Sequence, residues 1–175
     1  MSAQPLPARR RLFFALWPDE ALRRSIAARL QPAVGAGQPV APADLHVTLE
    51  FLGEVAESRR ATLEEIGAGF ALPAGELVLD HLEWWRTPAL VVARPGAAPA
   101  ALLALQSALR AVLAAEGFRV DARPYLPHAT LARRVAARPE LGSIEPLAWP
   151  LERFALVESG RHGTAHYHAL ASWTR

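Results

Sequence analysis

One four-residue pattern occurs twice in the chain and restricts the fold more than any other feature. It is His-x-Thr-Leu, present at His46-Val47-Thr48-Leu49 and again at His128-Ala129-Thr130-Leu131. Both copies lie in segments that read as β-strands, where His and Thr two residues apart point to the same face. If two halves of the molecule pack with pseudo-twofold symmetry, both His-Thr pairs can line the walls of one cleft.

Strands and helices are predicted to follow one another in an irregular order. Apolar or alternating runs predict strands at 11–17, 45–53, 76–85, 89–94, 118–121, 125–133, 149–158 and 165–173, and helical periodicity predicts helices at 19–30, 58–70 and 98–116. Residues 86–88 are predicted to form a hairpin turn, and Gly117 stands where a helix C-terminal cap belongs. Because the order is not a regular βαβ alternation, the sequence predicts an α+β fold with antiparallel sheets.

Length and hydrophobicity predict one compact unit. The chain has 175 residues, of which 51% are hydrophobic, enough for a single core. Residues 1–8, with Pro5 and Pro7, read as a flexible tail, and residues 9–175 as one bilobal domain. No apolar stretch approaches the roughly 20 residues needed to span a bilayer, and the first residues lack the apolar core of a signal peptide. We therefore expect a soluble cytoplasmic protein.

Two missing residue types exclude several chemistries. The chain has no Cys, which excludes disulfides, thiolate nucleophiles and Cys-ligated zinc. All 19 basic residues are Arg, so there is no Lys for a Schiff base, a lysyl-adenylate or a P-loop. The formal charge of +2 supports phosphate binding only weakly.

The repeated residues suit the opening of a cyclic phosphodiester. That reaction needs a base for the attacking group and an acid for the departing ribose oxygen, on opposite sides of phosphorus. Histidine serves both roles because its ordinary pKa, about 6.5, allows one ring to start neutral and the other protonated. The hydroxyls of Thr48 and Thr130 can donate to the non-bridging oxygens and hold the phosphorus in line. The scheme requires no metal.

The other histidines are interpreted as structural. His162-Gly163-Thr164 is a third His-x-Thr, but Ala165 follows it and it lies in a glycine-flanked turn. His81 is expected to be a hydrogen-bonded structural residue. His166 and His168 share a strand face and could form half of a metal site, yet no third ligand stands out, so we predict no bound metal.

At these motifs the sequence resembles the two-histidine (2H) phosphoesterase superfamily, in particular its RNA 2′,3′-cyclic phosphodiesterase branch, once called 2′-5′ RNA ligase. The resemblance runs nearly end to end. The stretches that carry it are Arg11-Leu12-Phe13-Phe14-Ala15-Leu16, Leu45 to Glu54, Pro127 to Arg133, and Phe154 to Ser159 followed by Tyr167. Both His and both Thr of the motifs match.

The resemblance implies a bilobal fold in which two antiparallel sheets flank a central cleft, with the helices outside. It implies metal-independent hydrolysis of RNA 2′,3′-cyclic phosphate ends to 2′-phosphate ends, with His46 as proton donor, His128 as proton acceptor, and Thr48 and Thr130 assisting. The expected partner is RNA with a 2′,3′-cyclic phosphate terminus. No cofactor, no membrane and a monomeric state are expected.

Three further residues are candidates for substrate binding. By resemblance, Arg133 is a phosphate ligand; strict alternation would point it away from the face of His128 and Thr130, unless a bulge or strand end after Leu131 turns it back. Phe14 and Tyr125 are candidates to stack a nucleobase, although aromatic residues on strands more often belong to the core.

Other functions remain open at this level. The same chemistry with a ribose hydroxyl in place of water would join RNA ends through a 2′-5′ linkage, without a nucleotide cofactor because lysine is absent. Other substrates of the superfamily, such as ADP-ribose cyclic phosphate or a small cyclic nucleotide, also fit. A non-catalytic module that binds RNA ends would use the arginines and aromatics but has no need for a matched acid and base.

Overall fold

The protein is described by a computed structural model that covers residues 8–162 and 165–175. The predicted tail, except Ala8, and residues 163–164 of the third His-x-Thr lie outside the described residues. The strands are β1 Arg9–Leu16, β2 Gln38–Pro39, β3 Val47–Ala56, β4 Glu76–Leu79, β5 His81–Trp85, β6 Leu90–Arg94, β7 Ala129–Arg133, β8 Leu147–Pro150, β9 Arg153–His162 and β10 Ala165–Thr174. The helices are α1 Glu20–Arg29, α2 Arg60–Ala68 and α3 Ala100–Ala115, with 3-10 turns η1 Gln31–Ala33, η2 Pro42–Asp44 and η3 Glu57–Arg59. None of the helices in this part of the chain is long and apolar enough to cross a membrane.

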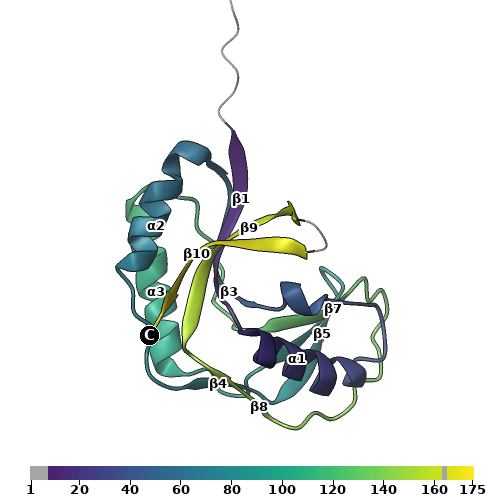
Figure 1. The fold of residues 1–175 in the computed structure, drawn as a ribbon. Helices are drawn as coiled ribbons and strands as arrows, with labels where there is room; N and C mark the ends of the chain where they lie inside the picture. Colours follow the sequence, from purple (N-terminus) through teal and green to yellow (C-terminus); the bar gives the residue numbers. More distant parts are fainter. Residues whose placement is uncertain (1–7, 163–164) are drawn as a thin grey trace, which may run out of the picture.

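The sheets are antiparallel, which confirms the predicted α+β class. The strands follow one path in the order β10-β9-β1-β3-β7-β6-β5, with β2 beside β7, and β4 and β8 form a separate pair. Within this path β1 and β3 pair along eight residues, whereas β3 and β7 meet at the pair Val47–Ala129. The two sheets of the predicted bilobal fold therefore join at a narrow seam between β3 and β7 (Figure 1).

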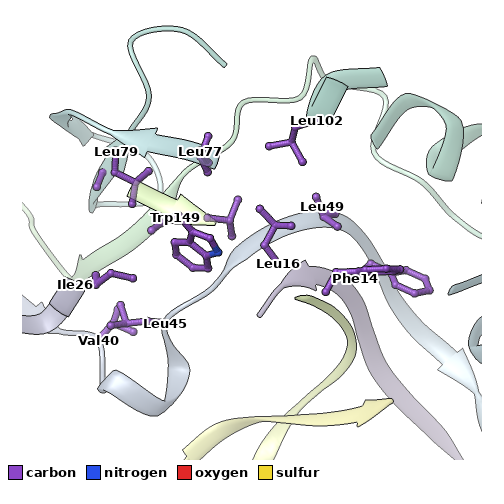
Figure 2. Close-up of a cluster of buried hydrophobic side chains, with 14 of the residues drawn as sticks. Phe14, Leu16, Ile26, Val40, Leu45, Leu49, Leu77, Leu79, Leu102 and Trp149 are labelled. Atoms are coloured by element: carbon purple, nitrogen blue, oxygen red, sulfur yellow. The ribbon is translucent and has the colours of Figure 1, made fainter. Parts of the chain in front are cut away.

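The helices lie outside the sheets. Helices α2 and α3 run beside the lobe formed by β10, β9, β1 and β3, and α1 packs against η1 and η2 on the side of the other lobe (Figure 1). Figure 2 shows the core between these layers, where Trp149 lies near Leu77 and Leu79. One cluster of buried residues extends from Phe14 on β1 to Leu131 on β7.

Local sequence signals explain the ends of the helices. The carboxylate of Asp19 accepts a hydrogen bond from the Leu22 amide at 2.7 Å and caps the start of α1. At the end of α3, Gly117 adopts φ +76°, and the Phe118 amide donates to the Leu113 carbonyl at 2.9 Å. A left-handed residue at this position favours glycine, as the sequence predicted.

Three predicted strands differ from the structure. The run 149–158 breaks at residues 151–152 into β8 and β9, which belong to different sheets. Residues 118–121 are not a strand: the Asp121 amide donates to the buried carboxylate of Glu50 at 2.7 Å instead of to a neighbouring strand. The run 76–85 breaks at Asp80 into β4 and β5, which belong to different sheets. Asp80 turns the chain there by accepting from the Gly96 amide at 2.8 Å. The differences at 118–121 and at Asp80 depend on partners distant in sequence.

Candidate active site

The two motifs meet at the seam between the lobes. Because β3 and β7 are antiparallel and Val47 pairs with Ala129, His46 comes opposite Thr130, and Thr48 opposite His128. Val47 and Ala129 are fully buried, while the four motif side chains are partly accessible. By alternation all four lie on one face of the joined strands, as the sequence predicted. Each imidazole thus faces the threonine of the other motif.

The same local contact orients both imidazoles. The Nδ1 atom of His46 lies 2.7 Å from the Asp44 carbonyl oxygen, and that of His128 lies 2.7 Å from the Leu126 carbonyl oxygen. A carbonyl oxygen only accepts, so each Nδ1 carries a proton and donates it. This fixes the tautomer of each neutral ring and leaves Nε2 as the atom that can exchange a proton with a substrate.

Aromatic side chains enclose His46. Its ring centre lies 5.0 Å from that of Phe13, 6.1 Å from that of Trp17 and 4.9 Å from that of Tyr167. Burial, with a smaller contribution from the nearby charge of Arg133, lowers the pKa of His46 to about 4. Burial also lowers the pKa of His128. The ordinary histidine pKa assumed from the sequence is therefore not maintained, and both rings favour the neutral form in the unliganded protein.

Arg133 lies on the His46 side of the seam. Residues Thr130 and Ala132 pair with consecutive residues of β6, so Leu131 is an extra residue that forms a β-bulge. The bulge returns Arg133 to the face of Thr130. The sequence analysis named such a bulge as the condition under which Arg133 would face the site. Its Nη2 donates to the Tyr167 hydroxyl at 3.2 Å. Arg133 is exposed and is positioned to contact an anion beside His46.

Asp44 links His46 to the last strand and was missed by the sequence analysis. Its buried carboxylate accepts from the backbone amides of His166 and Tyr167 at 2.9 and 3.2 Å, and lies 3.0 Å from His166 Nδ1. Its carbonyl oxygen holds the ring of His46. Asp44 therefore fixes Tyr167 relative to His46. Its position two residues before the motif is a signal that could have identified it.

A cavity of about 530 Å³ opens beside His128. We call it the His128 cavity; its lining includes Thr48, Phe51, Trp85, Arg110, Tyr125 and His128. The indole of Trp85 lies 4.4 Å from the His128 ring, centre to centre. Tyr125, predicted as a substrate contact, lines this cavity. Burial raises its pKa, so its hydroxyl stays protonated at neutral pH.

The prediction that Phe14 stacks a nucleobase is wrong. Its side chain is 0% exposed and packs against Phe154 and Trp173 in the core, so it cannot stack a nucleobase. The adjacent residue, Phe13, contacts His46 from the opposite face of β1. Among the described residues, no group of three or more His, Asp or Glu side chains is placed to hold a metal ion.

Comparisons with known proteins cover nearly the whole chain. Residues 17–163 match the family model of the 2′-5′ RNA ligase superfamily. The chain is 31% identical over 172 residues to the RNA 2′,3′-cyclic phosphodiesterase of Escherichia coli (strain K12), covering 93% of this chain and 95% of that protein. It is 32% identical over 162 residues to the protein of the same name from Thermus thermophilus, covering 85% of this chain and 81% of that protein.

Solved structures have the same fold. The crystal structure of E. coli LigT in apo form superposes with a TM-score of 0.81 at 29% identity, covering 95% of this chain and 98% of that one. A crystal structure described as a phosphoesterase superposes with a TM-score of 0.83 at 28% identity and the same coverage. The bilobal arrangement around the seam is thus shared with both.

Proposed function

The chain belongs to the 2′-5′ RNA ligase superfamily, and from this premise we propose that it hydrolyses RNA 2′,3′-cyclic phosphate ends to 2′-phosphate ends. The observation that carries the proposal is the paired arrangement at the seam. Two imidazoles with identical Nδ1-to-carbonyl contacts lie across from each other's threonine, and each leaves Nε2 for the substrate. The two RNA 2′,3′-cyclic phosphodiesterases at 31% and 32% identity support the choice of substrate.

In the proposed reaction, water attacks phosphorus while His128 takes its proton. The bond from phosphorus to O3′ breaks, and His46 gives its proton to that oxygen, which leaves a 2′-phosphate and a free 3′-hydroxyl. Hydroxyls of Thr48 and Thr130 donate to the non-bridging oxygens and stabilise charge in the transition state. The guanidinium of Arg133 attracts the phosphate on the His46 side. The two imidazoles account for both proton transfers, so the proposed chemistry needs no metal.

The proposed unit is a monomer acting on RNA. Both motifs come from one chain and meet at a seam within one core, so a single chain carries every residue that the mechanism uses. The partner is an RNA terminus with a 2′,3′-cyclic phosphate.

The test uses a short oligoribonucleotide ending in a 2′,3′-cyclic phosphate, incubated with the purified protein in excess EDTA. We expect conversion to the 2′-phosphate, identified by ³¹P NMR. Binding without turnover would instead support a non-catalytic RNA-end module. A rate that disappears on chelation and returns with a divalent ion would contradict the metal-independent mechanism.

The pH dependence should reflect the buried histidines. Catalysis needs one imidazole protonated and one neutral, and kcat/KM reports the pKa values of the unliganded protein. Since burial lowers the pKa of both rings below 6.5, the alkaline limb of kcat/KM should begin below pH 6.5 and the optimum should be acidic. The alkaline limb of the kcat profile should lie at higher pH than that of kcat/KM, because a bound phosphate favours the protonated imidazole. A kcat/KM that stays level through pH 8 would contradict this assignment.

A further inference from the structure

Strands β3 and β7 each contain a β-bulge just after the motif threonine, and these bulges shape the cleft on both sides of the seam. On β3, Thr48 and Glu50 pair with consecutive residues of β1, so Leu49 is an extra residue, just as Leu131 is on β7. Each bulge changes the alternation. Phe51, which is 39% exposed, therefore returns to the face of Thr48, as Arg133 returns to the face of Thr130.

The two bulges give the cleft two unlike ends. Near His46, the guanidinium of Arg133 and the hydroxyl of Tyr167 lie beside the aromatic rings that enclose this histidine. Near His128, it carries the rings of Phe51 and Trp85. A phosphorus atom held at the seam between the imidazoles would have a cationic wall on one side and an aromatic cavity on the other.

Charges around the His128 cavity are compensated within the protein. The Arg110 guanidinium donates to the Glu50 carboxylate at 2.9 Å and to the Arg123 carbonyl at 3.2 Å, and Arg123 forms an ion pair with Asp121. A phosphate group would therefore compete with existing carboxylates. Planar, uncharged groups fit better, because nucleobases stack on exposed aromatic rings whatever their sequence.

The size of the cavity suits a small-molecule ligand. Its volume of about 530 Å³ lies within the range typical of such sites.

We propose that the His128 cavity binds the nucleoside that carries the 5′-oxygen when this site joins RNA ends or cleaves a 2′-5′ linkage. The inference rests on the proposed function, in which His128 activates the attacking group. In joining, the 5′-hydroxyl replaces water: its proton goes to His128, its oxygen bonds to phosphorus, and the bond to O3′ breaks. His46 protonates O3′. Cleavage is the reverse, and neither direction consumes a cofactor.

The test measures binding rather than turnover. The first ligand is a dinucleotide in which 3′-deoxyadenosine is linked through a 2′-phosphate to the 5′-oxygen of adenosine. The second is the methyl ester of 3′-deoxyadenosine 2′-phosphate. Both are singly charged diesters, and neither has the 3′-hydroxyl that would attack phosphorus, so they differ only in the second nucleoside. Isothermal titration calorimetry gives the ratio of their affinities.

The protein should bind the dinucleotide about tenfold or more tightly than the methyl ester, because one stacked base contributes an effect of this size. Phe51→Ala and Trp85→Leu should each bring the ratio close to one. Leu103→Ala, which truncates a 38% exposed residue on α3 outside the cavity lining, is the matched control and should leave the ratio unchanged.

Three results would overturn the inference. They are an affinity ratio near one in the unmodified protein, no binding of either ligand, or an equal loss of affinity for both ligands in Phe51→Ala. Equal losses would assign the cavity to the cyclic-phosphate nucleotide itself. Failure of the proposed function is a separate result, because it appears as no hydrolysis of the cyclic-phosphate oligonucleotide whatever the affinity ratio.

Discussion

Replacing either His46 or His128 with alanine should reduce turnover of a 2′,3′-cyclic phosphate end by about 10²- to 10⁴-fold, since each loses a positioned proton-transfer group. The measurement is the single-turnover rate at saturating protein. The structure makes the two losses comparable, because both rings have the same Nδ1 contact and the same kind of threonine partner across the seam. The loss in the double variant should be much smaller than the product of the single losses, as for groups that act together.

A histidine outside the cleft provides the control that separates a catalytic effect from the effect of removing any imidazole. His81 on β5 has a side chain 44% exposed and lies 2.9 Å from the Asp80 carboxylate, outside the cleft. His81→Ala should retain the rate of the unmodified protein. His46→Gln keeps a hydrogen-bond donor for the Asp44 carbonyl. It tests whether the loss of rate in His46→Ala comes from a displaced loop rather than from the missing proton-transfer group. A rate close to normal in either alanine variant would remove that residue from the mechanism.

The second large effect concerns stability and centres on Glu50. Its side chain is fully buried, and its carboxylate accepts from Gln106 Nε2 and Arg110 Nε, each at 2.9 Å, and from the Asp121 amide at 2.7 Å. Glu50→Ala would leave these donors, one of them charged, without their acceptor. Breaking a buried pair in this way costs roughly 3 to 5 kcal/mol, and the 25% exposure of the Arg110 side chain favours the lower end.

Urea unfolding gives the measurement, with the free energy of unfolding obtained from the midpoint and slope. Glu54 on the same strand is exposed and provides the control; Glu54→Ala should change stability by at most about 0.5 kcal/mol. Double replacement, Glu50→Leu with Arg110→Leu, should recover part of the loss, because no buried charge is then left unpaired. Equal stability of Glu50→Ala and Glu54→Ala would show that the network contributes nothing.

The Glu50 network also explains why the sequence misplaced a strand. Residues 118–121 have an apolar start that favours a strand, but their path is fixed by the Glu50 carboxylate, which lies 71 residues away in sequence. A local pattern contains no information about that partner. The same contact holds the segment leading to Tyr125, so the wall of the His128 cavity depends on a buried charge that the sequence analysis did not single out.

Sequence alone determined the parts that depend on neighbouring residues. Alternation along a strand placed each His and Thr of a motif on one face, and the repetition of the motif predicted two related halves. Capping by Asp19 and the left-handed Gly117 follow equally from local chemistry.

Tertiary structure decided the rest, because those features depend on contacts between distant segments. Both faces of β1 are covered, so local alternation could not tell that Phe13 contacts His46 while Phe14 lies in the core. Pairing with neighbouring strands created the bulges that return Phe51 and Arg133 to the cleft, a result that strict alternation excludes. Packing of aromatic rings around His46 lowered its pKa, since desolvation is a property of the assembled fold.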